Sequence, residues 1–160
     1  MSRPVVVILM GSRSDEAHCQ KIAGAAHELG CETALHVGSA HKTPQHVLAL
    51  LERYEQDPRR KVFITVAGRS NALSGFVDAA VSAPVIACPP PSDAFGGADL
   101  FSSLRMPSGV APAVVLEPAN AALLAAKILG LCEPEINKAV CKFQKTMAEK
   151  IQMDNQDLQP

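Results

Sequence analysis

A histidine and a lysine stand side by side in a short polar segment, Ser39-Ala40-His41-Lys42-Thr43. An imidazole can take up or release a proton near neutral pH, and an ammonium group can neutralise a phosphate. Thr43 and the following Pro44 are typical of the N-cap and the first position of a helix. We therefore expect His41 and Lys42 in a loop just before a helix, as candidates for proton transfer and for anion binding.

The other four histidines are expected to have structural roles, because they fall within predicted helices or a strand: His18, His27, His36 and His46. No cluster of His, Cys, Asp or Glu has the spacing of metal ligands, and His41 and His46 lie five apart across a predicted loop–helix junction. We expect no metal and no other cofactor.

A second candidate segment is Gly11-Ser12-Arg13-Ser14-Asp15. The glycine lets the backbone approach a ligand, and the small hydroxyl side chains precede a predicted helix, where a phosphate is favoured. Asp15 suits a ribose, whose hydroxyls can donate to a carboxylate. The alternative is that Ser12 or Ser14 only caps the helix.

Two further polar segments follow predicted strands. The segment from Gly68 to Gly75 supplies glycines, hydroxyls and the amide of Asn71, which suit a polar ring or a phosphate, although alone it indicates only a turn. The segment 88–97 has three prolines and then two glycines, so it is either a rigid wall of a site or a surface loop.

Strands and helices are expected to alternate along the chain. Runs of apolar and β-branched residues predict strands at 5–10, 33–37, 62–67, 85–87 and 113–116, and apolar spacings of three and four predict helices between and after them. This order requires a parallel sheet covered on both sides. The predicted fold class is α/β: a three-layer, doubly wound parallel sheet, flavodoxin-like or Rossmann-like, in a single domain with a C-terminal helix.

Composition limits the organisation and the partners. With 160 residues and 48% hydrophobic content, we expect one domain at 1–153 and a polar, frayed tail at 154–160. The 15 basic and 16 acidic residues nearly cancel and do not cluster, so nucleic acid is not an expected partner. Apolar runs are too short for a membrane span, which favours a cytoplasmic protein. Five scattered cysteines without a CxxC pair are expected to be mostly buried.

Several familiar catalytic motifs are absent from the sequence. The chain has no GxxxxGK phosphate loop, no GxGxxG dinucleotide fingerprint and no GxSxG nucleophile elbow. ATP hydrolysis, hydride transfer and serine-hydrolase chemistry therefore lose support. What remains is a set of four loops at the carboxyl ends of parallel strands, where ligands bind in such sheets.

At these loops the chain resembles the aminoimidazole ribonucleotide carboxylases and mutases of purine biosynthesis, with GSRSD at 11–15 and SAHKTP at 39–44 in matching order. The resemblance covers nearly the whole chain. It implies an enzyme of one of two classes. The mutases rearrange a carbamate of the ribonucleotide, whereas the carboxylases add carbon dioxide directly to its ring.

The class is indicated by departures from the mutase pattern. Mutases typically have Arg after the active histidine and an AGGAAHLPG-like third loop, whereas this chain has Lys42 and AGRSNALSG at 67–75. GRSNALSG, CPPP and SSLRMPSG, at 68–75, 88–91 and 102–109, are similar to the carboxylase class of animal enzymes, where it is fused to a second activity. Thr43 is instead usual in mutases. We expect a carboxylase, with a mutase as the alternative and a nucleotide-sensing module as the non-enzyme alternative.

The resemblance implies the reaction and its residues. A carboxylase would add CO2 to 5-aminoimidazole ribonucleotide (AIR) and give 4-carboxy-AIR (CAIR) without ATP, biotin or metal. This addition is the reverse of a carbon–carbon lyase reaction, which would release CO2. His41 would be catalytic. The resemblance also implies a symmetric homo-oligomer, often an octamer. Six positions match the ribonucleotide-binding positions of the family, with Ser12, Lys42 and Ser70 favoured for phosphate and Asp15 for ribose: Ser12, Asp15, Ser39, Lys42, Gly68 and Ser70.

Overall fold

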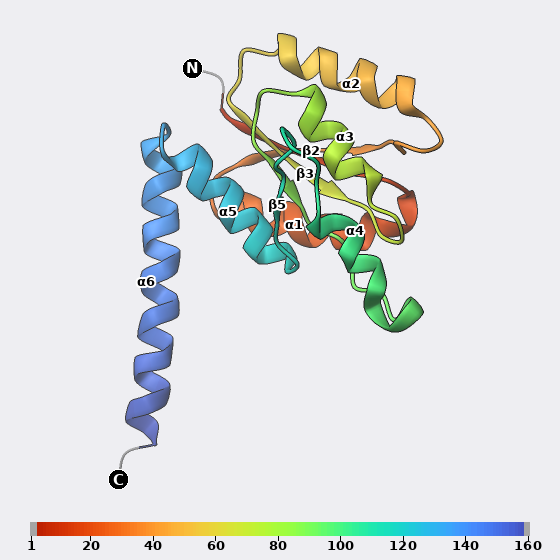
Figure 1. Cartoon of the computed structure of the whole chain (residues 1–160). Coiled ribbons are helices and arrows are strands. Elements are labelled where there is room, and N and C mark those ends of the chain that lie inside the picture. The colour runs from red at the N-terminus through yellow and green to blue at the C-terminus, as the bar shows by residue number, and fades with distance from the viewer. Residues whose placement is uncertain (1–2, 159–160) are drawn as a thin grey trace.

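Five strands form one parallel sheet in the computed structural model, which describes residues 3–158 (Figure 1). Their order across the sheet is β2-β1-β3-β4-β5, and every neighbouring pair is parallel. The first strand along the chain, which lies between two others, is fully buried because its side chains are apolar on both faces. The strands are β1 (Val5–Met10), β2 (Glu32–Val37), β3 (Lys61–Val66), β4 (Val85–Ala87) and β5 (Ala113–Val114).

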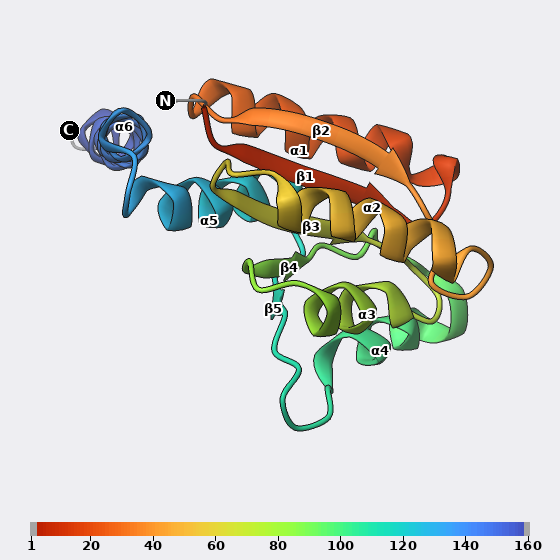
Figure 2. The same ribbon diagram turned by 90° about the horizontal axis from the view of Figure 1, so that it is seen from above.

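Helices cover both faces of the sheet (Figure 2). On one face, α1 (Glu16–Glu28) and α5 (Pro118–Gly130) pack against the side chains of Val6, Ile8 and Ile64. On the other, α2 (Pro44–Gln56) and α3 (Ala72–Ala80) pack against the alternate side chains, such as Val7 and Phe63. This three-layer, doubly wound arrangement confirms the predicted fold class, and its strand order is that of flavodoxin-like sheets.

The helix ends follow the signals in the sequence. Gly30, with φ +82°, terminates α1, and Thr43 and Pro44 occupy the N-cap and the first turn of α2. Within α2, Val47, Leu50 and Leu51 are buried. Leu48 shares their helical spacing but is 41% exposed, so the buried stripe of α2 is narrow.

The second half of the chain differs from the expected elements in two places. The last strand is shorter, because β5 ends at Val114 rather than at Leu116. The proline segment leads into a 3-10 turn, η2 (Ala94–Leu100), and a single helical turn, α4 (Phe101–Leu104), which the sequence analysis did not foresee. Phe95, Gly96 and Gly97 all have positive φ within η2, so this segment has no helical periodicity to detect.

The last helix, α6 (Pro134–Asp157), projects from the body of the molecule (Figure 1). Ile136 and Val140 are buried near its start, but further along the same apolar stripe Met147 is 45% and Ile151 68% exposed. Residues 154–157, expected to fray, belong to this helix, and 159 and 160 lie outside the described residues. No helix within residues 3–158 has the length and apolar character to cross a membrane.

The cysteines divide into two groups. Cys19, Cys31 and Cys88 are buried, as expected, and burial raises the pKa of the Cys88 thiol to about 12. Cys132 and Cys141 are exposed, near the α5–α6 turn and on α6. The expectation of mostly buried cysteines is correct for three of the five.

Candidate active site

A cavity of about 660 Å³ lies at the carboxyl ends of β1, β2 and β3. Its walls come from the loops that follow these three strands, because parallel strands bring their carboxyl ends to one edge of the sheet. All seven candidate residues line it: Ser12, Asp15, Ser39, His41, Lys42, Gly68 and Ser70. Residues spread over 59 positions of sequence are thus brought to one cavity by the topology.

The loop that carries His41 is fastened by hydrogen bonds between its two ends. The backbone N–H of Ser39 donates to Thr43 Oγ1 at 3.0 Å, and the Thr43 N–H donates to the Ser39 carbonyl at 2.8 Å. The Lys42 N–H donates to Ser39 Oγ at 3.2 Å. Thr43 thus uses its hydroxyl on this loop rather than as a side-chain cap of α2. The closed loop leaves His41 and Lys42 exposed at the cavity.

His41 differs from the other histidines in its hydrogen bonding. Within residues 3–158, it alone of the five makes no side-chain hydrogen bond. His18 contacts Cys88 Sγ at 3.3 Å, His27 contacts Thr33 Oγ1 at 2.9 Å, His36 contacts Tyr54 Oη at 2.7 Å and His46 contacts the Val37 carbonyl at 3.2 Å. The imidazole of His41 therefore has both ring nitrogens available for a ligand.

The first loop both caps a turn and keeps a donor for a ligand. Ser12 Oγ accepts hydrogen bonds from the Ser14 N–H at 3.3 Å and the Ser14 hydroxyl at 3.1 Å. Ser12 is the N-cap of the 3-10 turn η1 (Arg13–Asp15), whereas the N-cap position of α1 is taken by Asp15. Both contacts use lone pairs of Ser12 Oγ, which leaves its own O–H free to donate.

Asp15 is half-buried at the end of the same loop. Burial raises the pKa of its carboxyl, while the nearby His18 and the Ser14 hydroxyl act in the opposite direction. A partly desolvated carboxylate gains from hydroxyl donors that a ligand brings. This environment suits the ribose contact that the sequence suggested.

The third loop contributes Gly68, Arg69 and Ser70 to the cavity. Arg69 was not among the expected site residues. Its position between the candidates Gly68 and Ser70, together with its positive charge, was the sequence signal that could have identified it. Asn71, by contrast, is 3% exposed and does not face a ligand. Its Nδ2 donates to Ser103 Oγ at 2.8 Å, and its Oδ1 accepts from Ser74 N at 3.1 Å and Ser74 Oγ at 2.9 Å. The suggestion that this amide reads a ligand is wrong.

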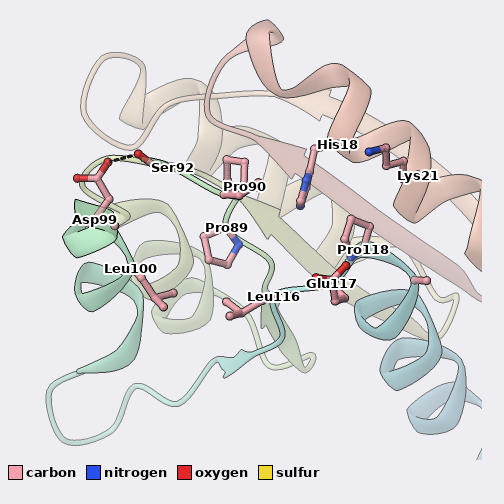
Figure 3. A pocket seen from close by; sticks show the side chains of 14 residues that line it. His18, Lys21, Pro89, Pro90, Ser92, Asp99, Leu100, Leu116, Glu117 and Pro118 are labelled. Carbon is pink, nitrogen blue, oxygen red and sulfur yellow. Dashed lines mark hydrogen bonds between the residues drawn. The ribbon is translucent and has the colours of Figure 1, made fainter. Parts of the chain in front are cut away.

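Figure 3 shows the side chains around a second cavity, of about 560 Å³. Gly68 lines both this cavity and the one that contains His41. The proline segment forms part of the wall of the second cavity, and α1 contributes His18 and Lys21. Of the two interpretations of the prolines, a rigid wall is correct, but the wall bounds this cavity and not the one that contains His41. Burial lowers the pKa of His18, which favours its neutral form beside the Cys88 thiol.

An exposed histidine and an exposed lysine at the carboxyl edge of an open parallel sheet have the chemistry for proton transfer and for binding an anionic small molecule. The comparisons with known proteins give the family. Residues 5–150 match the model of the AIR carboxylase family, and the chain belongs to this family. Two close similarities come from one spirochaete, Treponema denticola.

The first is a phosphoribosylaminoimidazole carboxylase, 56% identical over 156 residues that cover 98% of both chains. The second is the crystal structure of Treponema denticola PurE, with a TM-score of 0.97 over 99% of this chain and 100% of that one, at 56% identity. The predicted family and its enzymatic character are confirmed.

A mammalian relative bears on the class within the family. A bifunctional phosphoribosylaminoimidazole carboxylase/phosphoribosylaminoimidazole succinocarboxamide synthetase from Mus musculus is 45% identical over 126 residues, 79% of this chain and 30% of that protein. The similarity to fused animal enzymes, expected from the GRSNALSG and SSLRMPSG segments, is therefore confirmed.

Proposed function

We propose that this chain adds carbon dioxide to AIR and forms CAIR in purine biosynthesis, without ATP, biotin or a metal. The observation that carries the proposal is the loop-borne His41, exposed beside Lys42 in a cavity that also holds five further candidate residues. The carboxylase names and high identity of the relatives support the same reaction.

The chemistry requires one base and a well-positioned substrate. The electron-rich C4 of the aminoimidazole attacks the carbon of CO2, as an enamine would, and forms a carbon–carbon bond. His41 then takes the C4 proton, the electrons of the C–H bond restore the aromatic ring, and the proton passes to solvent. In reverse, protonated His41 protonates C4 and CO2 leaves. No oxidant, nucleotide or metal is needed to balance these steps.

The remaining polar residues bind the ribonucleotide in this proposal. Ser12, Lys42 and Ser70 take the phosphate with hydroxyl and ammonium donors, and Asp15 takes the ribose hydroxyls. Ser39 has its oxygen occupied by the Lys42 N–H and retains its O–H as a donor. A Cβ atom at Gly68 would lie 3.4 Å from Pro90 Cγ. A side chain at position 68 would therefore occupy space between the two cavities that Gly68 lines.

A direct assay distinguishes the proposal from its rivals. Purified protein is mixed with AIR and dissolved CO2 without ATP, and CAIR formation is followed. The carbamate is tested in parallel under CO2-depleted conditions. Turnover only from AIR supports the carboxylase, turnover only from the carbamate identifies a mutase, and no turnover in either assay leaves the nucleotide-sensing module.

His41→Asn tests the proposed base. The variant should bind AIR with near-normal affinity and lose at least about a hundredfold in kcat, the usual contribution of a general base. His27→Asn is the matched control, because His27 lies on α1 outside the cavity and should retain the wild-type rate. A near-normal rate in His41→Asn would contradict the mechanism.

We further propose that the protein acts in the cytoplasm as a homo-oligomer, with an octamer as the expected state and small molecules rather than nucleic acids or membranes as its partners. The exposed stripe of Met147 and Ile151 on α6 supports self-association. Light scattering after size exclusion should give the mass of an assembly, and a Met147→Glu/Ile151→Glu variant should shift it toward smaller species. A wild-type monomer would contradict the proposal.

A further inference from the structure

The hydroxyls of two serines, the half-buried Ser102 and the buried Ser103, connect α4 to the third loop of the candidate site. Ser103 is 1% exposed and its Oγ accepts a hydrogen bond from Asn71 Nδ2 at 2.8 Å. The neighbouring Ser102 Oγ accepts from the Asn71 backbone N–H at 2.9 Å, across 31 residues of sequence. Both serines of α4 thus contact Asn71, which directly follows Ser70.

The hydroxyl of Ser102 also holds the other end of this short backbone segment. Its O–H is directed between two carbonyls, that of Asp99 at 2.7 Å and that of Arg69 at 3.2 Å. One side chain therefore contacts the backbone on both sides of Ser70.

Arg69 adopts a conformation that needs such support. Its φ of +57° lies in the left-handed region, which residues other than glycine rarely occupy. A conformation of this kind persists where the surrounding structure holds it. Gly68 and Ser70 flank Arg69, and all three line the cavity, so the direction of their ligand-facing groups depends on this backbone conformation.

The network continues from Asn71 to the sheet. Asn71 Oδ1 accepts from Ser74, and the Ser74 hydroxyl contacts Thr65 Oγ1 on β3 at 2.8 Å. At its other end, Ser102 meets the Asp99 carbonyl of η2, and Ser92 Oγ donates to Asp99 Oδ2 at 3.0 Å (Figure 3), which ties η2 to the proline segment. The third loop is therefore held between the sheet and α4.

We propose that Ser102 and Ser103 are positioning residues, which act through Asn71 to hold the Gly68–Ser70 backbone in the conformation that binds the ribonucleotide. The proposal deepens the function proposed above and rests on it for the identity of the ligand. Neither serine lines the cavity, so neither is expected to contact the substrate or take part in the proton transfer.

The expected kinetic effect is a weaker binding of AIR with little change in the chemical step. Ser103→Ala and Ser102→Ala should each raise KM for AIR about tenfold, the equivalent of one lost hydrogen bond, and leave kcat within about threefold. Ser102→Thr retains a hydroxyl and should restore much of the affinity. Ser108→Ala is the control. Ser108 is exposed in the segment between α4 and β5, and its side chain makes no hydrogen bond within residues 3–158.

Hydrogen exchange provides a readout that does not depend on catalysis. In ligand-free protein, Ser102→Ala should speed exchange of the Asn71 amide, which loses its acceptor, while the amides of β1 keep their protection. If wild type does not turn over AIR but this local change occurs, the proposed function fails and the positioning role stands. Unchanged exchange at Asn71 would overturn the positioning role.

The kinetic arm has equally definite outcomes in an active enzyme. An unchanged KM in both alanine variants would overturn the proposal, as would a fall in kcat alone. If Ser103→Ala does not fold, the half-buried Ser102 pair of variants decides the question, with thermal unfolding used to show that both remain folded.

Discussion

A single methyl group added at Gly38 should disturb the loop that carries His41 without removing any polar group of that loop. Gly38 is buried between β2 and the loop that carries His41, and its N–H donates to the Met10 carbonyl at 2.9 Å. A Cβ built at this position lies 2.8 Å from Val47 Cγ2 and 3.5 Å from Leu9 Cδ1. The φ of Gly38 is not in the left-handed region, so alanine meets a steric obstacle and no backbone strain.

The size of the effect follows from these distances. Carbon atoms prefer a separation of at least about 3.5 Å, so the 2.8 Å contact must open by about 0.7 Å. Val47 is fully buried in α2 and cannot turn into solvent. Overpacking of this kind costs about 1–3 kcal/mol of the free energy of unfolding. If the loop yields, His41 moves with it, and kcat/KM should fall by at least about tenfold.

Denaturant unfolding and steady-state kinetics test this prediction, with Gly24→Ala as the matched control. Gly24 lies in α1, and a Cβ there has no neighbour within 4 Å, so alanine should raise the free energy of unfolding by about 0.5–1 kcal/mol. Val47→Ala removes the opposing methyl groups and should lessen the cost of Gly38→Ala in a double-mutant cycle by about 1 kcal/mol. A Gly38→Ala protein with wild-type stability and rate would refute the steric reasoning.

Three further outcomes are expected. Because burial raises the pKa of Asp15, its charge opposes folding at neutral pH. Asp15→Asn should therefore raise the free energy of unfolding at pH 7 by about 0.5 kcal/mol, and this gain should vanish below the ordinary pKa of 3.8. The same variant should bind AIR more weakly. Hydrogen bonds from Arg59 lower the pKa of Asp57 from 3.8 to about 2, so the stabilisation by its charge is present above pH 3.8 and is lost as the pH falls through about 2. Asp57→Asn should therefore cost about 1 kcal/mol of the free energy of unfolding at pH 7 and progressively less as the pH approaches and passes below about 2, by denaturant unfolding at each pH. In a thiol titration of the native protein, the three buried cysteines should stay unreactive, whereas all five should react after unfolding; fast reaction of a third native thiol would contradict the described burial.

The parts of the fold that the sequence predicts are those with strong local signals. The apolar run of β1, the Thr43–Pro44 start of α2 and the glycine after α1 each indicate one structure, and the tertiary contacts agree with them. That the seven candidate residues line one cavity was also predictable, because each follows a strand of a parallel sheet and such loops meet at one edge.

The features that escaped prediction depend on contacts between distant segments. Asn71 looks like a ligand-binding amide in a polar loop, and only the serines of α4, about thirty residues later, show that it is a buried structural group. Leu48 fits the spacing of a helical stripe, but in the folded chain it is 41% exposed. The turn α4 is too short to produce a periodic pattern.

The far half of α6 has a thermodynamic consequence for the protein in solution. Beyond Val140 the helix has few buried side chains in its own chain, and isolated helical segments of this length are marginal in water. Its helicity is then linked by mass action to whatever covers the Met147 and Ile151 stripe. If the cover is a second copy, circular dichroism at 222 nm becomes a measure of protein concentration, and dilution alone should melt the end of the chain while the sheet stays folded.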